Sequence, residues 1–314
     1  MSGIESASVF TFSDYEDYEK TILHIPSSAI LPASVFKIGQ SVRGRDIHCL
    51  CLGDREPAKN GVLYLSLLHG LEFIGGDICL GIIKWFLDER NREEAERITS
   101  RCNAYFVPVA NPDGYQTALN KRGKWFFSSA RKNAAGVDLN RNFPVGFYPE
   151  RLRFAMASGS PFMPVYRGPK PFSEPEACAI KYLVESASLR ASISFHSPGR
   201  YIGYPYCYKG TRCPDYKELH RVASAMRAQQ PHFKYRVGQE YYYYPTTGDL
   251  NDWLYEKFGT FAFIFEVGGL GFRLGDPSTW FYPFAWCNSP DVEREVENDL
   301  PAALYLIRWA AEIS

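Results

Sequence analysis

Short, nearly unbroken apolar runs alternate with amphipathic segments through most of the chain. Unbroken runs predict strands that are buried on both faces, and they cover 46–52, 62–68, 104–109, 193–196 and 261–265. Apolar residues at helical spacing predict helices over 75–90, 173–184 and 291–312. This alternation predicts an α/β fold. Since no Gly/Ser linker or internal repeat divides the 314 residues, a single domain is expected.

Two regions without such periodicity are rich in Pro, Gly and aromatic residues. They cover 115–172 and 267–290, and we expect loops there. The first follows Asn111-Pro112-Asp113-Gly114, a strong turn signal. Because rigid scaffolds carry their functional residues on loops, these regions are expected to build the site.

The charge balance limits the possible partners. Lys and Arg together number 35, as do Asp and Glu, so the basic stripe of a nucleic-acid binder is not expected. No stretch reaches the roughly 18 apolar residues that span a bilayer, and the N-terminus lacks the pattern of a secretory signal. We therefore expect a cytoplasmic protein with neither nucleic acid nor membrane as a partner.

The eight cysteines do not form the pattern of a disulfide framework or a zinc knot, because no Cys-x-x-Cys pair exists. Most lie in apolar segments, where a thiol behaves as a small apolar group. Cys207 and Cys213 flank a predicted turn and could pair, although a reducing compartment disfavours this.

A His and a Glu follow directly on the strand predicted over 62–68. His69 and Glu72 are three residues apart in His69-Gly70-Leu71-Glu72, so both can face one zinc ion. Taken alone, the tetrapeptide is better explained as a helix N-terminus at which Glu72 favours the dipole. A third ligand would have to come from far along the chain, and His196 at the end of a strand is the candidate. The other four histidines have no carboxylate at ligand spacing and are expected to be surface or core residues: His24, His48, His220 and His232.

Two further clusters suggest a binding or catalytic site. Asn140 and Arg141 place an amide beside a guanidinium, which suits the capture of a carboxylate, although a surface salt bridge is the simpler explanation for this Arg. Glu266 ends the apolar run 261–265. Since a buried charge without a partner is costly, Glu266 is either paired or catalytic, and a strand end favours catalysis.

Five motifs in this order make the chain resemble the carboxypeptidase A family of zinc peptidases. They are His69-Gly-Leu-Glu72, Asn111-Pro-Asp-Gly114, Asp138-Leu-Asn-Arg-Asn142, Ser194-Phe-His-Ser197 and Phe265-Glu266. The resemblance implies one domain with a central mixed, twisted β-sheet flanked by helices. The catalytic domain would cover residues 41–314, with residues 1–40 as an N-terminal extension packed on it.

The resemblance implies a role for each matching residue near the metal. His69, Glu72 and His196 would bind one Zn²⁺ and leave a fourth position open for water. Glu266 would be the general base and proton shuttle. Arg131 would face the developing oxyanion when the positions are counted back from Asp138, whereas counting forward from Gly114 would place Phe126 there.

The resemblance also implies how the substrate is held. Asn140 and Arg141 would bind its terminal carboxylate, and Tyr244 would close over it. Because three other tyrosines precede Tyr244, its register could slip by one. In the family, the residue before the Asp252-Trp253 pair lines the pocket for the last side chain. Here that residue is Asn251, with Asp249 nearby, so a polar last residue is expected to be preferred, followed by a basic one.

The leading hypothesis is a zinc-dependent metallocarboxypeptidase that hydrolyses the C-terminal peptide bond of a peptide with a free carboxylate. The main alternative is a murein tripeptide amidase that cuts the γ-D-glutamyl-diaminopimelate bond, because residues 136–144 match a sequence motif of bacterial enzymes of that kind. Deacylation of N-acyl amino acids is a further possibility. An inactive zinc- and peptide-binding relative would be expected to lack a ligand, the base or the carboxylate-binding pair, yet all are present.

The chain also departs from the best-known members of the family. Because His69 lies so close to the start, we expect neither a secretory signal nor a pro-segment ahead of it. Pro198 stands where digestive relatives have an aromatic residue, so contact with the preceding substrate residue should differ.

Overall fold

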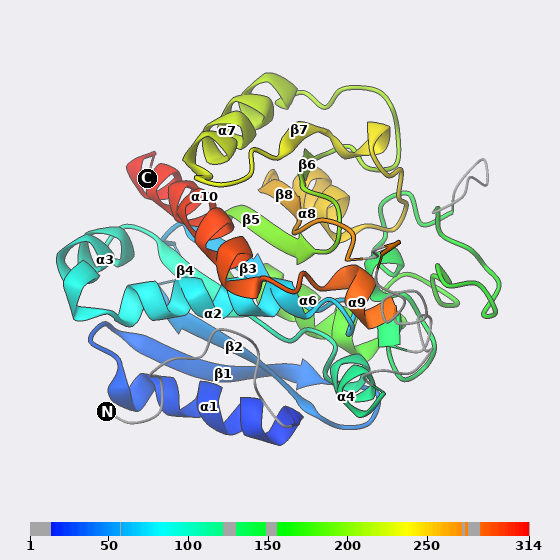
Figure 1. The fold of residues 1–314 in the computed structure, drawn as a ribbon, viewed down its shortest axis with the longest axis horizontal. Helices are drawn as coiled ribbons and strands as arrows, with labels where there is room; N and C mark the ends of the chain where they lie inside the picture. Colours follow the sequence, from blue (N-terminus) through cyan, green and yellow to red (C-terminus); the bar gives the residue numbers. More distant parts are fainter. Residues whose placement is uncertain are drawn as a thin grey trace.

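The chain forms one eight-stranded mixed sheet with helices on both faces (Figure 1). The computed structural model describes residues 14–56, 58–121, 130–148, 156–271, 274–275 and 283–313. The strands are β1 (Ala33–Gln40), β2 (Asp46–Leu52), β3 (Gly61–Leu65), β4 (Asn103–Val107), β5 (Leu189–His196), β6 (Tyr201–Tyr204), β7 (Arg236–Gln239) and β8 (Phe261–Glu266). Their order across the sheet is β1-β2-β4-β3-β5-β8-β6-β7.

The middle of the sheet is parallel. β4, β3, β5 and β8 run in the same direction, whereas β2 joins β4, and β6 joins β8, in antiparallel pairs. The mixed sheet expected from the family resemblance is therefore confirmed. Since the carboxyl ends of the four central strands share one edge, residues that follow them meet there.

The alternation of side chains along the strands divides the core into two layers. On one face, side chains such as Val62, Tyr64 and Ile193 pack against α1 (Tyr15–Ser28), α2 (Phe73–Leu87), α3 (Arg92–Thr99), α7 (Tyr216–Gln229) and α10 (Val292–Glu312). On the other face, Leu63 and Leu65 belong to the layer beneath α6 (Pro175–Ser186) and α8 (Leu250–Phe258). Figure 1 shows α2 and α10 running across the first face. Period-two burial on both faces explains the unbroken apolar runs.

Some predicted boundaries are wrong at the edge that carries the site, and β4, for example, ends at Val107 instead of continuing to residue 109. β3 ends at Leu65 instead of continuing to residue 68, because Leu67 adopts a left-handed conformation with φ of 54° that no strand can continue. Asn111-Pro112-Asp113-Gly114 is not a free turn but begins α4 (Pro112–Asn120). Its first Asn accepts a hydrogen bond from the Gly114 N–H, and Pro at the first helical position suits this start.

The N-terminal segment is part of the layered structure. α1 packs against β1, and β1 pairs with β2 along one edge of the sheet. A boundary between an extension and a catalytic domain at residues 40 and 41 remains a prediction.

Two other expectations concern membrane-spanning helices and a disulfide bond. Among the described residues, no helix has the length and hydrophobicity needed to cross a membrane. Cys207 and Cys213 are both buried free thiols, so they do not form the disulfide that their positions would have allowed.

Candidate active site

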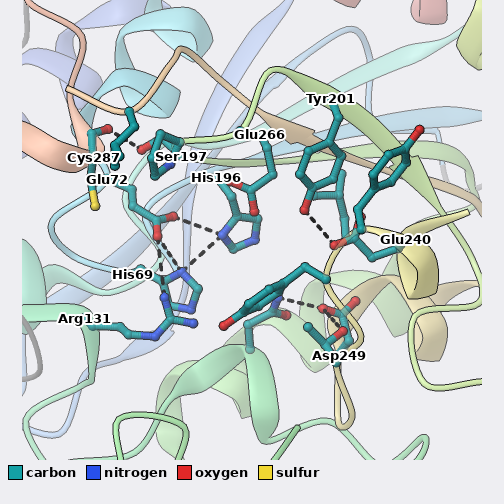
Figure 2. A pocket seen from close by; sticks show the side chains of 18 of the residues that line it. His69, Glu72, Arg131, His196, Ser197, Tyr201, Glu240, Asp249, Glu266 and Cys287 are labelled. Carbon is teal, nitrogen blue, oxygen red and sulfur yellow. Dashed lines mark hydrogen bonds and ion pairs between the residues drawn. The ribbon is translucent and has the colours of Figure 1, made fainter. Parts of the chain in front are cut away.

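Three side chains from distant parts of the chain converge on one point (Figure 2). His69 and Glu72 follow β3, and His196 is the last residue of β5. The Nδ1 atoms of the two histidines are 3.2 Å apart, and each lies 2.9–3.0 Å from an oxygen of Glu72. All three residues are buried.

This donor set fits a zinc ion. Ligands bonded to one ion at about 2 Å must lie roughly 3 Å from one another, as these atoms do. The outer ring nitrogens are already engaged, since His69 Nε2 is 3.0 Å from Asp138 Oδ1 and His196 Nε2 is 2.9 Å from Ser194 Oγ. When Nε2 donates its hydrogen outward, the lone pair of Nδ1 remains for a metal. The three residues predicted as ligands are thus brought together by the fold.

Glu266 is positioned beside the cluster by strand pairing. It ends β8, where it pairs in register with His196 of the neighbouring β5. Burial is the main cause that raises the pKa of Glu266, to about 7, and the nearby Glu72 carboxylate raises it further. A carboxyl group with a pKa near neutrality can both accept and return a proton, as a general base and acid must.

Arg131 lies on the other side of the cluster. Its Nε and Nη2 are 3.1 and 3.0 Å from Asp138 Oδ2, and its Nη1 is 3.8 Å from Glu72 Oε1. Although burial opposes ionisation, the Arg131 and Arg141 guanidiniums hold the pKa of Asp138 well below its usual range. Asp138 therefore joins His69 to Arg131. Phe126, the alternative to Arg131, lies outside the described residues.

Asn140 and Arg141 form a second polar group, in the cavity that also contains His69, Glu72 and His196. They belong to a short 3₁₀ turn over Leu139–Arg141, and Arg141 is almost fully buried. Asn140 donates through Nδ2 to Asp249 Oδ2 over 2.7 Å, and its Oδ1 accepts from the Leu250 N–H. Both contacts come from the start of α8, and together they hold the Asn140 side chain in place.

Tyr244 stands at the mouth of the cavity, with about a third of its surface exposed. Its ring centre lies 6.0 Å from Arg141 Cζ. Tyr243, the neighbour onto which the register could have slipped, stacks instead on Tyr201 with ring centres 4.9 Å apart. The geometry therefore favours Tyr244 over Tyr243 as the partner of Arg141.

These groups share one cavity of about 700 Å³. Nine of the ten residues predicted as ligands, catalytic groups or substrate-binding groups line it: His69, Glu72, Arg131, Asn140, Arg141, His196, Tyr244, Asp249 and Glu266. Asn251 is not among the lining residues and is buried at the start of α8. Tyr201 and Glu240 also line the cavity, although the sequence did not single them out. The one available signal for Glu240 was a lone carboxylate ahead of four tyrosines.

The fold and this cluster of ligands define a metallopeptidase-like site, and the sequence places it in a family. The family model described as zinc carboxypeptidase matches residues 32–292. The chain therefore belongs to the zinc carboxypeptidase family.

Similar proteins include several mammalian carboxypeptidases. The chain is 29% identical to carboxypeptidase A6 of Homo sapiens over 275 residues, which are 83% of this chain and 61% of that protein. It is 30% identical to carboxypeptidase B2 of Mus musculus over 253 residues, 76% of this chain and 59% of that protein. The chain thus spans about three fifths of the length of these relatives.

Solved structures share the fold. Thrombin activatable fibrinolysis inhibitor matches with a TM-score of 0.79 and 23% identity over 96% of this chain and 75% of that chain. Murein-tripeptide amidase MpaA from Escherichia coli O157 matches with a TM-score of 0.53 and 21% identity over 90% of this chain and 94% of that chain.

Proposed function

We propose that this protein is a zinc-dependent metallocarboxypeptidase that hydrolyses the last peptide bond of a peptide with a free C-terminal carboxylate. The observation that carries the proposal is the meeting of three kinds of group in one cavity. They are the ligand set His69, Glu72 and His196, the carboxyl group of Glu266, and the amide and guanidinium of Asn140 and Arg141. Family membership supports the same function.

His69, Glu72 and His196 would hold the zinc ion, which supplies a Lewis acid that makes water more acidic and polarises a carbonyl. Glu266 takes a proton from the attacking water and gives it to the leaving amine. Arg131 contributes positive charge where the carbonyl oxygen becomes negative. The proton balance closes because the water supplies a hydroxyl to the new acid and a hydrogen to the amine.

Asn140 and Arg141 restrict the reaction to the end of a peptide. A guanidinium beside an amide binds a carboxylate through charge-assisted hydrogen bonds, and burial of Arg141 strengthens them. Tyr244 at the mouth covers the bound end. A peptide bond within a chain offers no carboxylate at this position and would leave Arg141 without its partner.

The experiment that tests the proposal compares one peptide with its C-terminal amide, using zinc-loaded protein. Release of the last residue should fall by at least about 10²-fold on amidation, because a charged hydrogen-bonding partner is lost. Glu266→Gln serves as the control, since it should retain zinc and lose about 10²–10⁴-fold in kcat. Equal cleavage of the acid and the amide would contradict an exopeptidase.

A second candidate is the murein tripeptide amidase activity. The cavity carries the carboxyl group of Glu240 together with the guanidinium of Arg236, so it could hold a last residue whose side chain bears both an ammonium and a carboxylate group, as diaminopimelate does. Including a γ-D-glutamyl-diaminopimelate tripeptide beside ordinary peptides in the assay separates the two. Faster cleavage of the tripeptide would favour the amidase.

A further inference from the structure

Glu240 is a buried carboxyl group in the cavity, and only one of its two oxygens has a hydrogen-bond donor among the described residues. It lies in the short 3₁₀ turn Glu240–Tyr242 after β7 and is only 1% exposed. Its Oε1 accepts a hydrogen bond of 2.8 Å from the Tyr201 hydroxyl (Figure 2). Its Oε2 has no partner among the residues that the structure describes. A buried carboxylate oxygen that has lost its water and gained no hydrogen bond raises the free energy of the folded protein. A donor is therefore expected to bind this oxygen.

The backbone leaves room for this oxygen. Oε2 lies against Gly203 of β6, where any β-carbon would overlap it. Gly203 is therefore required for the position of the carboxylate, and the carboxylate is held from one side by Tyr201. The arrangement fixes Glu240 on the cavity wall instead of leaving it free to turn towards bulk water.

The charges around Glu240 favour a positive partner. Burial above all, and then the carboxylates Glu266, Asp249 and Asp252, hold the pKa of Glu240 well above its usual range. Asp249 cannot act as the free acceptor, because its oxygens already receive Asn140 Nδ2 and the Asn251 N–H. Without a cation nearby, burial and these carboxylates favour the protonated form of Glu240, whereas a cation beside Oε2 would favour the ionised form that accepts its hydrogen bond.

The cations in the cavity are occupied elsewhere. Arg131 bonds to Asp138, and Arg141 lies in the pair assigned to the substrate carboxylate. Arg236 is exposed and packs against the ring of Tyr243, 5.3 Å from its centre, so water screens its charge. A cation that enters with the substrate would therefore not compete with these arginines for Glu240, which lines the same cavity.

The wall beside Glu240 suits a long aliphatic stem. The rings of Tyr201 and Tyr243 are stacked at 22° and present an aromatic surface. Methylene groups of Lys or Arg pack on such a surface while the charged end reaches a carboxylate. Asp249, which accepts from Asn140 Nδ2, lies close enough to Glu240 to influence its pKa, so a residue held at Asn140 and Arg141 by its α-carboxylate would lie in the same cavity as Glu240.

We propose that Glu240 selects peptides whose last side chain is cationic, by accepting a hydrogen bond from its ammonium or guanidinium group. The inference rests on the proposed carboxypeptidase function and names its substrate class. It assigns specificity to a residue of the segment after β7 instead of to Asn251 or Asp249.

The first test uses the unaltered zinc-loaded protein and three peptides that differ only in the last residue. They end in lysine, in Nε-acetyl-lysine or in norleucine, which share the stem and differ in charge. The expected kcat/KM for lysine is about 10- to 100-fold above both neutral analogues, as for a hydrogen bond to a charged group. Equal rates, or faster cleavage of norleucine, would overturn the inference.

The second test changes the carboxylate. Glu240→Gln keeps the size and an acceptor for Tyr201, and it should reduce the ratio of lysine to norleucine at least about tenfold. Glu256→Gln is the matched control, because it removes the same charge from an exposed position on α8 and should leave the ratio unchanged. An unchanged ratio in Glu240→Gln would overturn the role of Glu240; if that variant fails to fold, the three-peptide comparison still decides.

A binding measurement separates this inference from the proposed function. Calorimetry with the zinc-loaded Glu266→Gln protein should show at least about tenfold tighter binding of the lysine peptide than of the norleucine peptide. Tight binding of lysine with no cleavage by the unaltered protein would overturn the proposed function and support the role of Glu240. Cleavage without a preference for lysine would do the reverse.

Discussion

Each candidate ligand histidine is held by a second polar group at its outer nitrogen. His69 contacts Asp138, and His196 contacts the Ser194 hydroxyl two residues back on the same strand. Such contacts fix the ring orientation and the tautomer before any ion arrives. Asp138 also holds Arg131, so one carboxylate orients a candidate metal ligand and the cation assigned to the oxyanion.

The pKa of Glu266 predicts how activity depends on pH. Burial raises this pKa from 4.5 to about 7, and a cation at the neighbouring ligand set would lower it towards the ordinary value. Since the base works only when ionised, kcat/KM should fall about tenfold per pH unit below an apparent pKa between 4.5 and 7. The measurement is a pH profile of kcat/KM with zinc content determined at each point. A profile that stays flat well below pH 4.5, with zinc retained, would remove Glu266 as the base.

At the scale of elements, the site is built where central strands end. β3 leads into His69 and Glu72, β5 ends at His196 and β8 ends at Glu266. The turn after β3 is held close to α4, because Gly70 lies against the backbone of Gly114. This approach explains why the turn that carries two ligands also carries a glycine.

Replacing Gly70 by Ala should therefore disturb both stability and metal binding. The added β-carbon would overlap backbone atoms of Gly114 and Tyr115, which cannot move aside as a flexible side chain can. We expect the free energy of unfolding to fall by about 1–3 kcal/mol and zinc affinity to weaken. Gly275→Ala is the control, because no atom of the residues that the structure describes lies within 4 Å of the new atom. Chemical denaturation and zinc titration of both variants give the comparison, and an unaffected Gly70→Ala would show that the contact is not tight.

The strand-end residues could be predicted from the sequence because each one follows a recognisable apolar run. Glu266 was singled out for this reason, and His196 likewise. Glu240 and Tyr201 could not be found in this way, because their meeting depends on the pairing of β6 with β7 and β8, and no local pattern encodes that pairing. The end of β3 at Leu65 also cannot be predicted from the apolar run. Leu67 adopts a left-handed backbone conformation that a Leu residue rarely adopts by itself, so tertiary packing must impose it.

At the scale of the whole molecule, the metal would join parts of the chain that are 127 residues apart. An ion that binds only the folded chain stabilises it, by about 2.7 kcal/mol at a concentration 100 times its dissociation constant. Zinc should therefore raise the midpoint of thermal unfolding, and chelation should reverse the change.

The effect of zinc should depend on His196 and not on histidines elsewhere. His196→Ala should lose most of the stabilisation, whereas His24→Ala, which changes an exposed residue of α1, should keep it. Calorimetric scans with and without zinc measure this. Full stabilisation of His196→Ala would mean that the ion binds at another place, and the group Glu19, Asp46 and His48 would be the first to examine.

The in-register pairing of β5 with β8 sets the position of Glu266 relative to His196. Because neighbouring side chains along a strand point to opposite faces, a slip of this pairing by a single residue would turn Glu266 away from the ligand that it now adjoins. Under the proposed function, such a protein would keep the candidate zinc ligands and the carboxylate-binding pair, yet Glu266 could no longer take the proton of water. The proposed reaction would therefore depend on ladder hydrogen bonds at the centre of the core as much as on the side chains assigned to it.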